Sequence, residues 1–272
     1  MKYSIITVNY NNKEGLRKTI ESVIHQTYRD FEYIVIDGGS TDGSADVLKE
    51  YDKDISYWVS EPDGGIYQGM NKGIARATGD YLNFMNSGDC FYDENVLQKI
   101  ANQNLDADMI IGSDYWYNPK TKKDFATILP LRLEMFTFYK GSLPHQSTFF
   151  KKNLFDQYQY DETLKVVSDW KFYIQKIVGE GCTVKYFDGI ICRKDLDDGV
   201  GYTFAEKADK EKKAFIAQYL PIGIQKHYDI LTRFDTSTFY KLIAICEKPK
   251  ALHYLTLAIK IIYRIFIFFH KK

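Results

Sequence analysis

Cysteine is scarce in this chain: its 272 residues include only four, Cys90, Cys182, Cys192 and Cys246. No two of them form a Cys-x-x-Cys pair, and the amino terminus runs straight into a strand-like segment without a basic and apolar leader. These absences argue against a secreted, disulfide-built domain and favour free, buried thiols in a reducing cytoplasm. A Cys182–Cys192 disulfide stays open on spacing alone.

An excess of charge of either sign is also absent. Lys plus Arg and Asp plus Glu each number 36, so the formal net charge is zero. Without a global field the chain neither attracts nucleic acid nor repels acidic partners. We therefore expect no nucleic-acid partner, and any charge-based binding must be local.

Two phosphate-binding motifs are missing as well. The sequence has no G-x-G-x-x-G after its first strand and no G-x-x-x-x-G-K-[ST], which disfavours hydride transfer and NTP hydrolysis. What the chain does have is 45% hydrophobic and 16% aromatic residues. That is enough to bury the core of one large domain, or of one domain with a helical appendage.

The first 113 residues alternate between strand and helix patterns. Residues 4–8 form an apolar, β-branched run, 16–24 place apolar residues on one helix face, and 31–36 form a second strand. The alternation continues with helices at 44–51, 66–77 and 94–102 and strands at 55–59, 81–85 and 109–112. It predicts an open, mostly parallel α/β sheet flanked by helices, with ligands beyond the carboxyl ends of the strands.

The rest of the chain has a different character. Residues 114–202 have an α+β pattern, with a strand at 146–150 and a helix through 170–177, and residues from about 203 onward are helical. We therefore expect a main domain at 1–202, made of the halves 1–113 and 114–202, followed by a helical extension at 203–272.

The segment 249–272 is apolar but interrupted by charge. Lys260 and Arg264 fall inside the hydrophobic run, where charges make a membrane span costly. The pattern favours a helix lying on a membrane surface with its basic residues near anionic headgroups: Lys250, Lys260, Arg264, Lys271 and Lys272. A packing helix of the main body and an oligomer contact stay open.

Acidic residues follow three strands of the predicted sheet. Asp37 comes directly after Ile34-Val-Ile36, Asp63 lies in Glu61-Pro-Asp-Gly-Gly, and Asp89 ends Asn86-Ser-Gly-Asp. Acids gathered at one sheet edge repel one another unless a cation or a ligand donor offsets them. The pattern therefore indicates Mg²⁺ or Mn²⁺ bound together with a phosphorylated or polyhydroxylated ligand.

Several of these stretches together resemble a known family. "SIITVNYNN", "VIDGGSTDGS", "SEPDGGIYQGMNKGIARATGDYLNFMNSGD" and "HQSTFF" followed by "VSDW" resemble, in order and spacing, the family-2 glycosyltransferases with a GT-A fold. The resemblance covers roughly residues 1–200. It is strongest to the bacterial branch that builds capsule, O-antigen and exopolysaccharide.

The resemblance implies a catalytic domain at 1–202 with a nucleotide-binding half (1–113) and an acceptor half (114–202). It also implies a nucleotide-diphosphate sugar as donor. Thr7, Asn9 and Tyr10 are then expected near the base and ribose, with Asp37 accepting from the base. An aromatic lid over the sheet edge is the alternative for Tyr10. The family's Asp-x-Asp after its fourth strand corresponds to Asn86, Gly88 and Asp89.

In this match Asn86 replaces the ribose-contacting acid, and Asp89 meets the metal ion. Asp63 and either Lys72 or Arg76 are the remaining implied donor contacts.

On the acceptor side the resemblance makes Asp169 the catalytic base and puts His145 and Trp170 in the donor or acceptor pocket. Each has a structural alternative: Asp169 as a first-turn acid complementing its helix dipole, His145 and Trp170 as core residues.

The implied function is inverting transfer from a nucleotide sugar, most simply a UDP-sugar, to a lipid-linked or growing polysaccharide at the inner membrane face. A sugar-nucleotidyltransferase and a catalytically inactive carbohydrate-binding protein are the alternatives.

Overall fold

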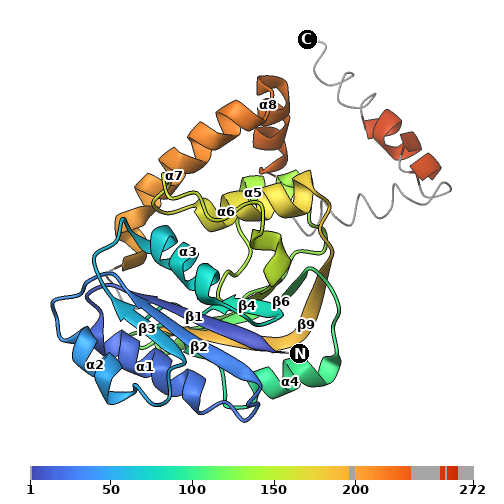
Figure 1. Cartoon of the computed structure of the whole chain (residues 1–272). Coiled ribbons are helices and arrows are strands. Elements are labelled where there is room, and N and C mark those ends of the chain that lie inside the picture. Colours follow the sequence, from blue (N-terminus) through green and yellow to red (C-terminus); the bar gives the residue numbers. More distant parts are fainter. Residues whose placement is uncertain (1, 196–199, 234–251, 255, 263–272) are drawn as a thin grey trace. The chain divides into compact units, whose positions relative to one another are not determined.

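The structure is a computed structural model that describes residues 2–195, 200–233, 252–254 and 256–262 (Figure 1). Two compact units divide the chain, residues 1–215 and 216–272. The boundary expected at 202/203 falls within helix α7 (Val200–Tyr219), whereas the second unit contains α8 (Ile222–Leu231) and helical residues at 252–254 and 256–262. Most of the predicted segment 249–272 lies outside the described residues.

A nine-stranded sheet organises the first unit. Its order is β3-β2-β1-β4-β8-β6-β9-β5, with β7 paired to β6. Pairing is parallel from β3 to β4 and between β6 and β9, and β8 runs antiparallel between β4 and β6. The strands are β1 (Tyr3–Asn9), β2 (Phe31–Asp37), β3 (Tyr57–Ser60), β4 (Tyr81–Phe84), β5 (Cys90–Phe91), β6 (Met109–Asn118), β7 (Lys123–Ala126), β8 (Thr148–Lys151) and β9 (Val184–Asp195).

Helices cover both faces of this sheet (Figure 1). They are α1 (Lys13–Ile24), α2 (Ser44–Glu50), α3 (Ile66–Arg76), α4 (Val96–Gln103), α5 (Met135–Lys140) and α6 (Ser168–Tyr173), the last continued by a π-helical turn (Ile174–Gly179). The predicted mixed, mostly parallel α/β sheet flanked by helices is thereby confirmed.

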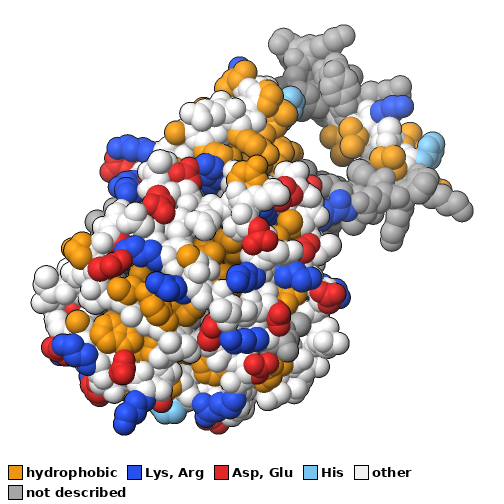
Figure 2. Space-filling view, viewed as in Figure 1, with side chains coloured by type: hydrophobic (Ala, Val, Ile, Leu, Met, Phe, Trp, Pro, Cys, Tyr) orange, Lys and Arg blue, Asp and Glu red, His pale blue; other side chains and the backbone are white. Residues whose placement is uncertain are grey.

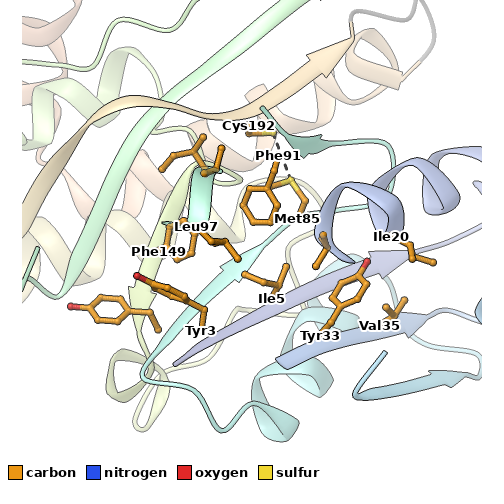
Figure 3. Packing of buried hydrophobic residues seen from close by; sticks show 14 of the residues in the cluster. Tyr3, Ile5, Ile20, Tyr33, Val35, Met85, Phe91, Leu97, Phe149 and Cys192 are labelled. Atoms are coloured by element: carbon orange, nitrogen blue, oxygen red, sulfur yellow. Dashed lines mark hydrogen bonds between the residues drawn. The ribbon is translucent and has the colours of Figure 1, made fainter. Parts of the chain in front are cut away.

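The main hydrophobic core lies between the sheet and helices α1, α2 and α4. Figure 3 shows part of this core. Alternate residues of β1 and β2, among them Tyr3, Ile5, Tyr33 and Val35, point to this side and are almost fully buried. Burial of each such side chain contributes about 1.5–3 kcal/mol. The alternation of the strands therefore fixes which face of the sheet each helix covers.

Helix α3 packs on the opposite face at very short range. A Cβ atom on Gly73 would lie 2.5 Å from Ile6 Cγ2, and one on Gly69 would lie 2.7 Å from Val8 Cγ1. The two glycines let the helix approach β1 closely. This contact fixes where the loop before α3 meets the end of the sheet.

The distribution of surface charge and the state of the cysteines agree with the expectations from composition. Acidic and basic side chains are interspersed on the face shown in Figure 2. Cys90, Cys182 and Cys192 are free thiols, so the open disulfide does not form; Cys246 lies outside the described residues. No helix in the described ranges is long and apolar enough to cross a membrane.

Candidate active site

The carboxyl ends of β1, β2, β3 and β4 meet at one edge of the sheet, and each is followed by a polar loop. Asp37, the last residue of β2, is buried there and accepts four hydrogen bonds. Its donors are Asn9 Nδ2 at 2.7 Å, Ser60 Oγ at 2.5 Å, and Ser40 through Oγ at 2.5 Å and its backbone N–H at 3.0 Å.

These bonds decide the chemistry of Asp37. Burial raises the pKa of its carboxyl, but the hydrogen bonds from Ser40, Ser60 and Asn9 outweigh burial, so its pKa is lowered. Both oxygens are already engaged twice. A nucleobase N–H could reach this carboxylate only by displacing one of the present donors.

The β1 residues expected near the nucleotide differ in access. Asn9 is buried, and its Oδ1 has no hydrogen-bond partner. Tyr10 is 68% exposed at the start of the next loop. Thr7 instead faces the core, where its hydroxyl donates to the Met85 carbonyl at 2.7 Å and contacts Tyr33 Oη at 3.0 Å. Thr7 shares this face of β1 with Asn9 but lies two residues further from the carboxyl end of the strand. Its hydroxyl is already bound to Met85 and Tyr33, and a nucleotide contact of Thr7 stays a prediction.

Asp63 occupies a notch between two glycines. A Cβ atom on Gly38 would lie 3.1 Å from its Oδ1, and one on Gly69 would lie 3.3 Å from its Oδ2. Oδ1 accepts from the Gly65 backbone N–H at 2.9 Å, at the start of α3. The loops after β2 and β3 are thus fastened together with this carboxylate between them.

The two basic residues of α3 lie near opposite ends of strand β3. Lys72 Nζ reaches Glu61 at 2.8 Å, just beyond the carboxyl end of β3. Arg76 is one turn further along and stacks on Tyr57, the first residue of β3, with 4.5 Å between Cζ and the ring centroid. Arg76 therefore lies at the amino edge of the sheet, whereas Lys72 lies near the loops that follow the strands. A donor contact of either residue stays a prediction.

The turn after β4 carries Asn86 and Asp89. Gly88 has φ +103°, a conformation that favours glycine and lets the chain reverse there. The Asn86 Oδ1 atom is buried without a partner, and Asp89 Oδ2 accepts from Gln146 Nε2 at 2.9 Å. Burial raises the pKa of Asp89, an effect that the nearby Lys194 ammonium only partly offsets.

A series of hydrogen bonds and an ion pair connects Asp89 with Asp114 on β6. Gln146 Oε1 accepts from Lys194 Nζ at 2.7 Å, and Lys194 pairs with Asp114 at 2.9 Å. Ser147 Oγ donates to the other Asp114 oxygen at 2.5 Å. Burial lowers the pKa of Lys194, but the carboxylates of Asp89 and Asp114 outweigh burial and raise it, so Lys194 is a cation.

Asp169 faces a cavity of about 300 Å³, which Gln146, Lys194 and Asp114 also line. Its Oδ1 accepts from Tyr67 Oη at 2.8 Å, and Tyr67 comes from the first turn of α3. Burial and then the Asp169 charge raise the pKa of Tyr67, which keeps its proton and remains a donor. The other acid of the cavity, Asp114, is already bound to Lys194 and Ser147, so Asp169 is the better proton acceptor.

His145 and Trp170 have structural surroundings. The His145 ring lines the cavity, stacks on Phe84 at 5.2 Å and bonds Tyr160 Oη at 2.8 Å, and burial lowers its pKa. Trp170 is 2% exposed, does not line the cavity, and donates to the Phe138 carbonyl at 2.8 Å. Helix α6 thus turns Trp170 toward the core, and a role for it in the donor or acceptor pocket stays a prediction.

The residues of the β4 turn fit a hard divalent cation. No cluster of three or more His, Cys, Asp or Glu side chains suited to a metal occurs in the described parts of the chain. Mg²⁺ and similar ions, however, are often held by one or two protein oxygens together with substrate phosphates. The unpartnered Asn86 Oδ1 and the Asp89 carboxylate are two such oxygens on one turn.

The sequence motifs gave no role to Tyr67 or Asp114. Tyr67 stands in the same "EPDGGIY" stretch as Asp63, and Asp114 directly follows an apolar strand run. Both features could have marked these residues as candidates for the site. The partners that give them their roles are distant in sequence, and Tyr67 and Asp169 are 102 positions apart.

Sequence comparison places the chain among known transferases. The profile of Glycosyl transferase family 2 matches residues 4–178. An uncharacterized glycosyltransferase of Mycobacterium tuberculosis is 34% identical over 212 residues, 73% of this chain and 76% of that protein. A PGL/p-HBAD biosynthesis glycosyltransferase of Mycobacterium bovis is 26% identical over 75% of this chain and 81% of that protein.

Solved structures share the fold at low identity. S. aureus TarS 1-349 in complex with UDP-GlcNAc superposes with a TM-score of 0.61 at 18% identity, over 75% of this chain and 61% of that one. The mannosyltransferase PcManGT from Pyrobaculum calidifontis, in complex with GDP-Man and Mn²⁺, gives 0.55 at 15% identity, over 74% and 59%. The matched part thus spans about three fifths of those solved chains. On the strength of the family match and the 34% identical relative, this chain belongs to glycosyl transferase family 2 and is a glycosyltransferase.

Proposed function

We propose that this enzyme transfers a sugar, with inversion, from a UDP-sugar to a hydroxyl of a lipid-linked or growing polysaccharide. Asp169 acts as the general base, and Asp89 lies at the donor diphosphate. The observation that carries the proposal is the cavity in front of Asp169, joined to the Asp89 turn through Gln146. Donor and acceptor sites then adjoin, as a direct transfer requires.

Each step follows from the positions of this chain's own side chains. The acceptor hydroxyl lies in the cavity, and Asp169 takes its proton as the oxygen attacks the anomeric carbon. The bond from that carbon to the diphosphate breaks on the opposite side. Tyr67 holds Asp169 by donating to Oδ1, which leaves Oδ2 for the acceptor proton.

The donor end is supported by the loops at the sheet edge. Asn9, Asp63 and Asn86 offer buried or half-buried oxygens, and Tyr10 an exposed ring, around the place for the nucleotide. Asp89 and Asn86 would hold Mg²⁺ or Mn²⁺ together with phosphate oxygens. When bound, that ion offsets the negative charge that grows on the leaving diphosphate. TarS with UDP-GlcNAc and PcManGT with GDP-Man and Mn²⁺ support this choice of ligands.

The acceptor is the less constrained part of the proposal. One relative is named for PGL/p-HBAD biosynthesis, whereas the sequence motifs resemble the bacterial capsule and O-antigen branch. In the helical residues 252–254 and 256–262, the apolar side chains Leu257, Ile259, Ile261 and Ile262 are half or more exposed, with Lys260 among them. This composition supports work at the inner face of a membrane.

The proposal is tested by UDP release from a panel of UDP-sugars, with and without Mg²⁺ or Mn²⁺, in the presence of detergent-solubilised glycan lipids. We expect release with one donor, dependence on the metal ion, and a product of inverted anomeric configuration by NMR. Asp89→Ala should abolish the metal-dependent release. Asp106→Asn, an exposed acid at the amino edge that pairs with Lys151, is the matched control and should behave as wild type.

A product of retained configuration, or full activity in Asp89→Ala, would contradict the proposal. Binding of a UDP-sugar without any turnover would favour the alternative of a binding protein. The sugar-nucleotidyltransferase alternative does not fit the family to which the chain belongs.

A further inference from the structure

The cavity in front of Asp169 is lined by two kinds of side chain. Three are apolar: Trp116, Leu143 and Pro144. The others carry hydroxyl, amide, imidazole or charged groups, among them Asp114, Gln146, Asp169 and Lys194. A sugar ring has the same division, with C–H groups on its faces and hydroxyls around its edge.

The described residues around the cavity carry no excess of positive charge. Among the described lining residues only Lys194 is a lysine or arginine, and it is bound to Asp114 at 2.9 Å. Lys212 is a second cation and lies over the Trp170 ring at 5.3 Å. With Lys212 included, two cations face the carboxylates of Asp114 and Asp169. An anionic group entering here would compete with Asp114 for Lys194 and would lie near the Asp169 carboxylate.

One of the apolar lining residues, Trp116, belongs to an aromatic pair. Trp116 on β6 and Phe125 on β7 are nearly parallel, with an interplanar angle of 10° and ring centroids 6.2 Å apart. Trp116 Nε1 donates to Thr127 Oγ1 at 3.3 Å, and Lys194 Nζ lies 4.9 Å from its ring centroid, so the indole is held in place. Phe125 is 56% exposed and presents its ring to solvent.

We propose that this cavity binds an uncharged sugar residue of the acceptor, which is therefore a neutral glycan end and not a phosphate or a uronic acid. The inner residue packs against Trp116, Leu143 and Pro144 and turns a hydroxyl to Asp169. The next residue of the glycan lies on Phe125. This inference rests on the proposed function and adds the chemical class of the acceptor to it.

The preference of the cavity for uncharged sugars is tested with three sets of compounds: methyl glycosides of neutral hexoses, the corresponding hexuronic acids and the hexose 6-phosphates. Once a donor is known, each is offered as acceptor to the full chain, and its binding to Asp169→Asn is followed by saturation-transfer NMR. We expect kcat/KM for the neutral glycosides to exceed that for the charged ones at least tenfold, with saturation transferred to the ring protons. Preference for a charged glycoside, or no binding of any glycoside, overturns the inference.

The contact of Phe125 with the second sugar residue is tested by substitution. Phe125→Ala should raise KM about fivefold for a neutral disaccharide acceptor, because an aromatic contact is lost, and should change KM for the monosaccharide much less. Phe125→Trp should restore the disaccharide KM. Ile128→Ala, which removes another exposed apolar side chain, is the control. Equal effects of Phe125→Ala on the two acceptors would contradict the subsite.

Slow hydrolysis of the donor by water distinguishes failure of the proposed function from failure of the inferred acceptor class. If wild type hydrolyses no nucleotide sugar and transfers to no acceptor, the proposed function fails. If hydrolysis or transfer is observed but charged acceptors are preferred, the proposed function stands and only the acceptor class is wrong.

Discussion

Two aspartates that follow parallel strands have opposite surroundings. Asp37 accepts four hydrogen bonds from Asn9, Ser40 and Ser60, and its pKa is lowered. Asp89 accepts one side-chain hydrogen bond, from Gln146, and burial raises its pKa. The first is a structural link between three strand ends. The second retains an oxygen for a ligand, so the two acids cannot exchange roles.

The same turn yields a prediction about metal affinity. Asn86→Asp puts a second carboxylate where a buried amide oxygen now lacks a partner. We expect Mn²⁺ to bind without nucleotide about tenfold more tightly, since a carboxylate adds charge to a hard-ligand site. Titration calorimetry measures this affinity, with Asn86→Ala as the variant that should show no gain. Equal affinity in wild type and Asn86→Asp would argue that Asn86 does not face the ion.

At this scale the sequence indicated only part of the site. The acids at the strand ends could be predicted because parallel strands end at one edge. The core contacts of Thr7 and Trp170 and the position of Arg76 at the amino edge could not be predicted, since the resemblance covers motifs and says little about which way each side chain turns. Tyr67 acquires its role only through Asp169, 102 positions away.

The elements around the site are held by close backbone contacts. Gly39 has φ +78°, and a Cβ atom there would lie 2.8 Å from the backbone nitrogen of Pro62, so the loops after β2 and β3 interlock. Gly39→Ala should lower the free energy of unfolding by about 2 kcal/mol or more, from backbone strain and overlap.

Chemical denaturation measures the effect of this change, and UDP affinity should fall with it. Gly141→Ala is the control, because Gly141 has extended backbone and no atom within 4 Å of the added Cβ. If the two variants are equally stable, the loops are not interlocked as described.

A carboxylate at the other edge links β1, β2 and β4. Burial raises the pKa of Glu32, but hydrogen bonds from Ser4 and Thr78 and the Lys2 charge lower it to about 2. The folded pKa is below its usual 4.5, so Glu32 stabilises the fold above that pH and the stabilisation is lost as pH falls from about 4.5 to 2.

Urea denaturation at several pH values tests this dependence. Wild type should lose about 2 kcal/mol more than Glu32→Gln between pH 5 and pH 2, after allowance for solvent screening. Parallel curves for the two proteins would show that Glu32 contributes no linkage.

The pattern of elements was more predictable than their pairing. Helices and strands up to residue 112 lie within a few residues of their expected bounds, because their apolar periodicity is local. The insertion of β8 between β4 and β6, and the continuation of β6 to Asn118, depend on contacts between distant residues. Those contacts bring His145, Gln146 and Asp114 to the site.

On the scale of the whole molecule, the apolar helical residues near the carboxyl terminus are the feature beyond the catalytic unit. We expect the full chain to sediment with vesicles containing anionic lipid and to do so less as salt rises. Replacing Leu257 and Ile261 together by Asn should reduce the bound fraction several-fold, because two exposed apolar side chains are lost. Ile128→Asn is the control, and equal binding of all three proteins would contradict a membrane role for this segment.

We propose Asp169 as the general base in a cavity adjoining the donor site. This role is tested by comparing Asp169→Asn with wild type, by UDP calorimetry in the presence of Mn²⁺ and by transfer under single-turnover conditions. We expect unchanged UDP affinity and a transfer rate lowered about 10²–10⁴-fold, the usual contribution of a positioned base. A variant that binds UDP normally and still transfers sugar at the wild-type rate would show that Asp169 is not the base.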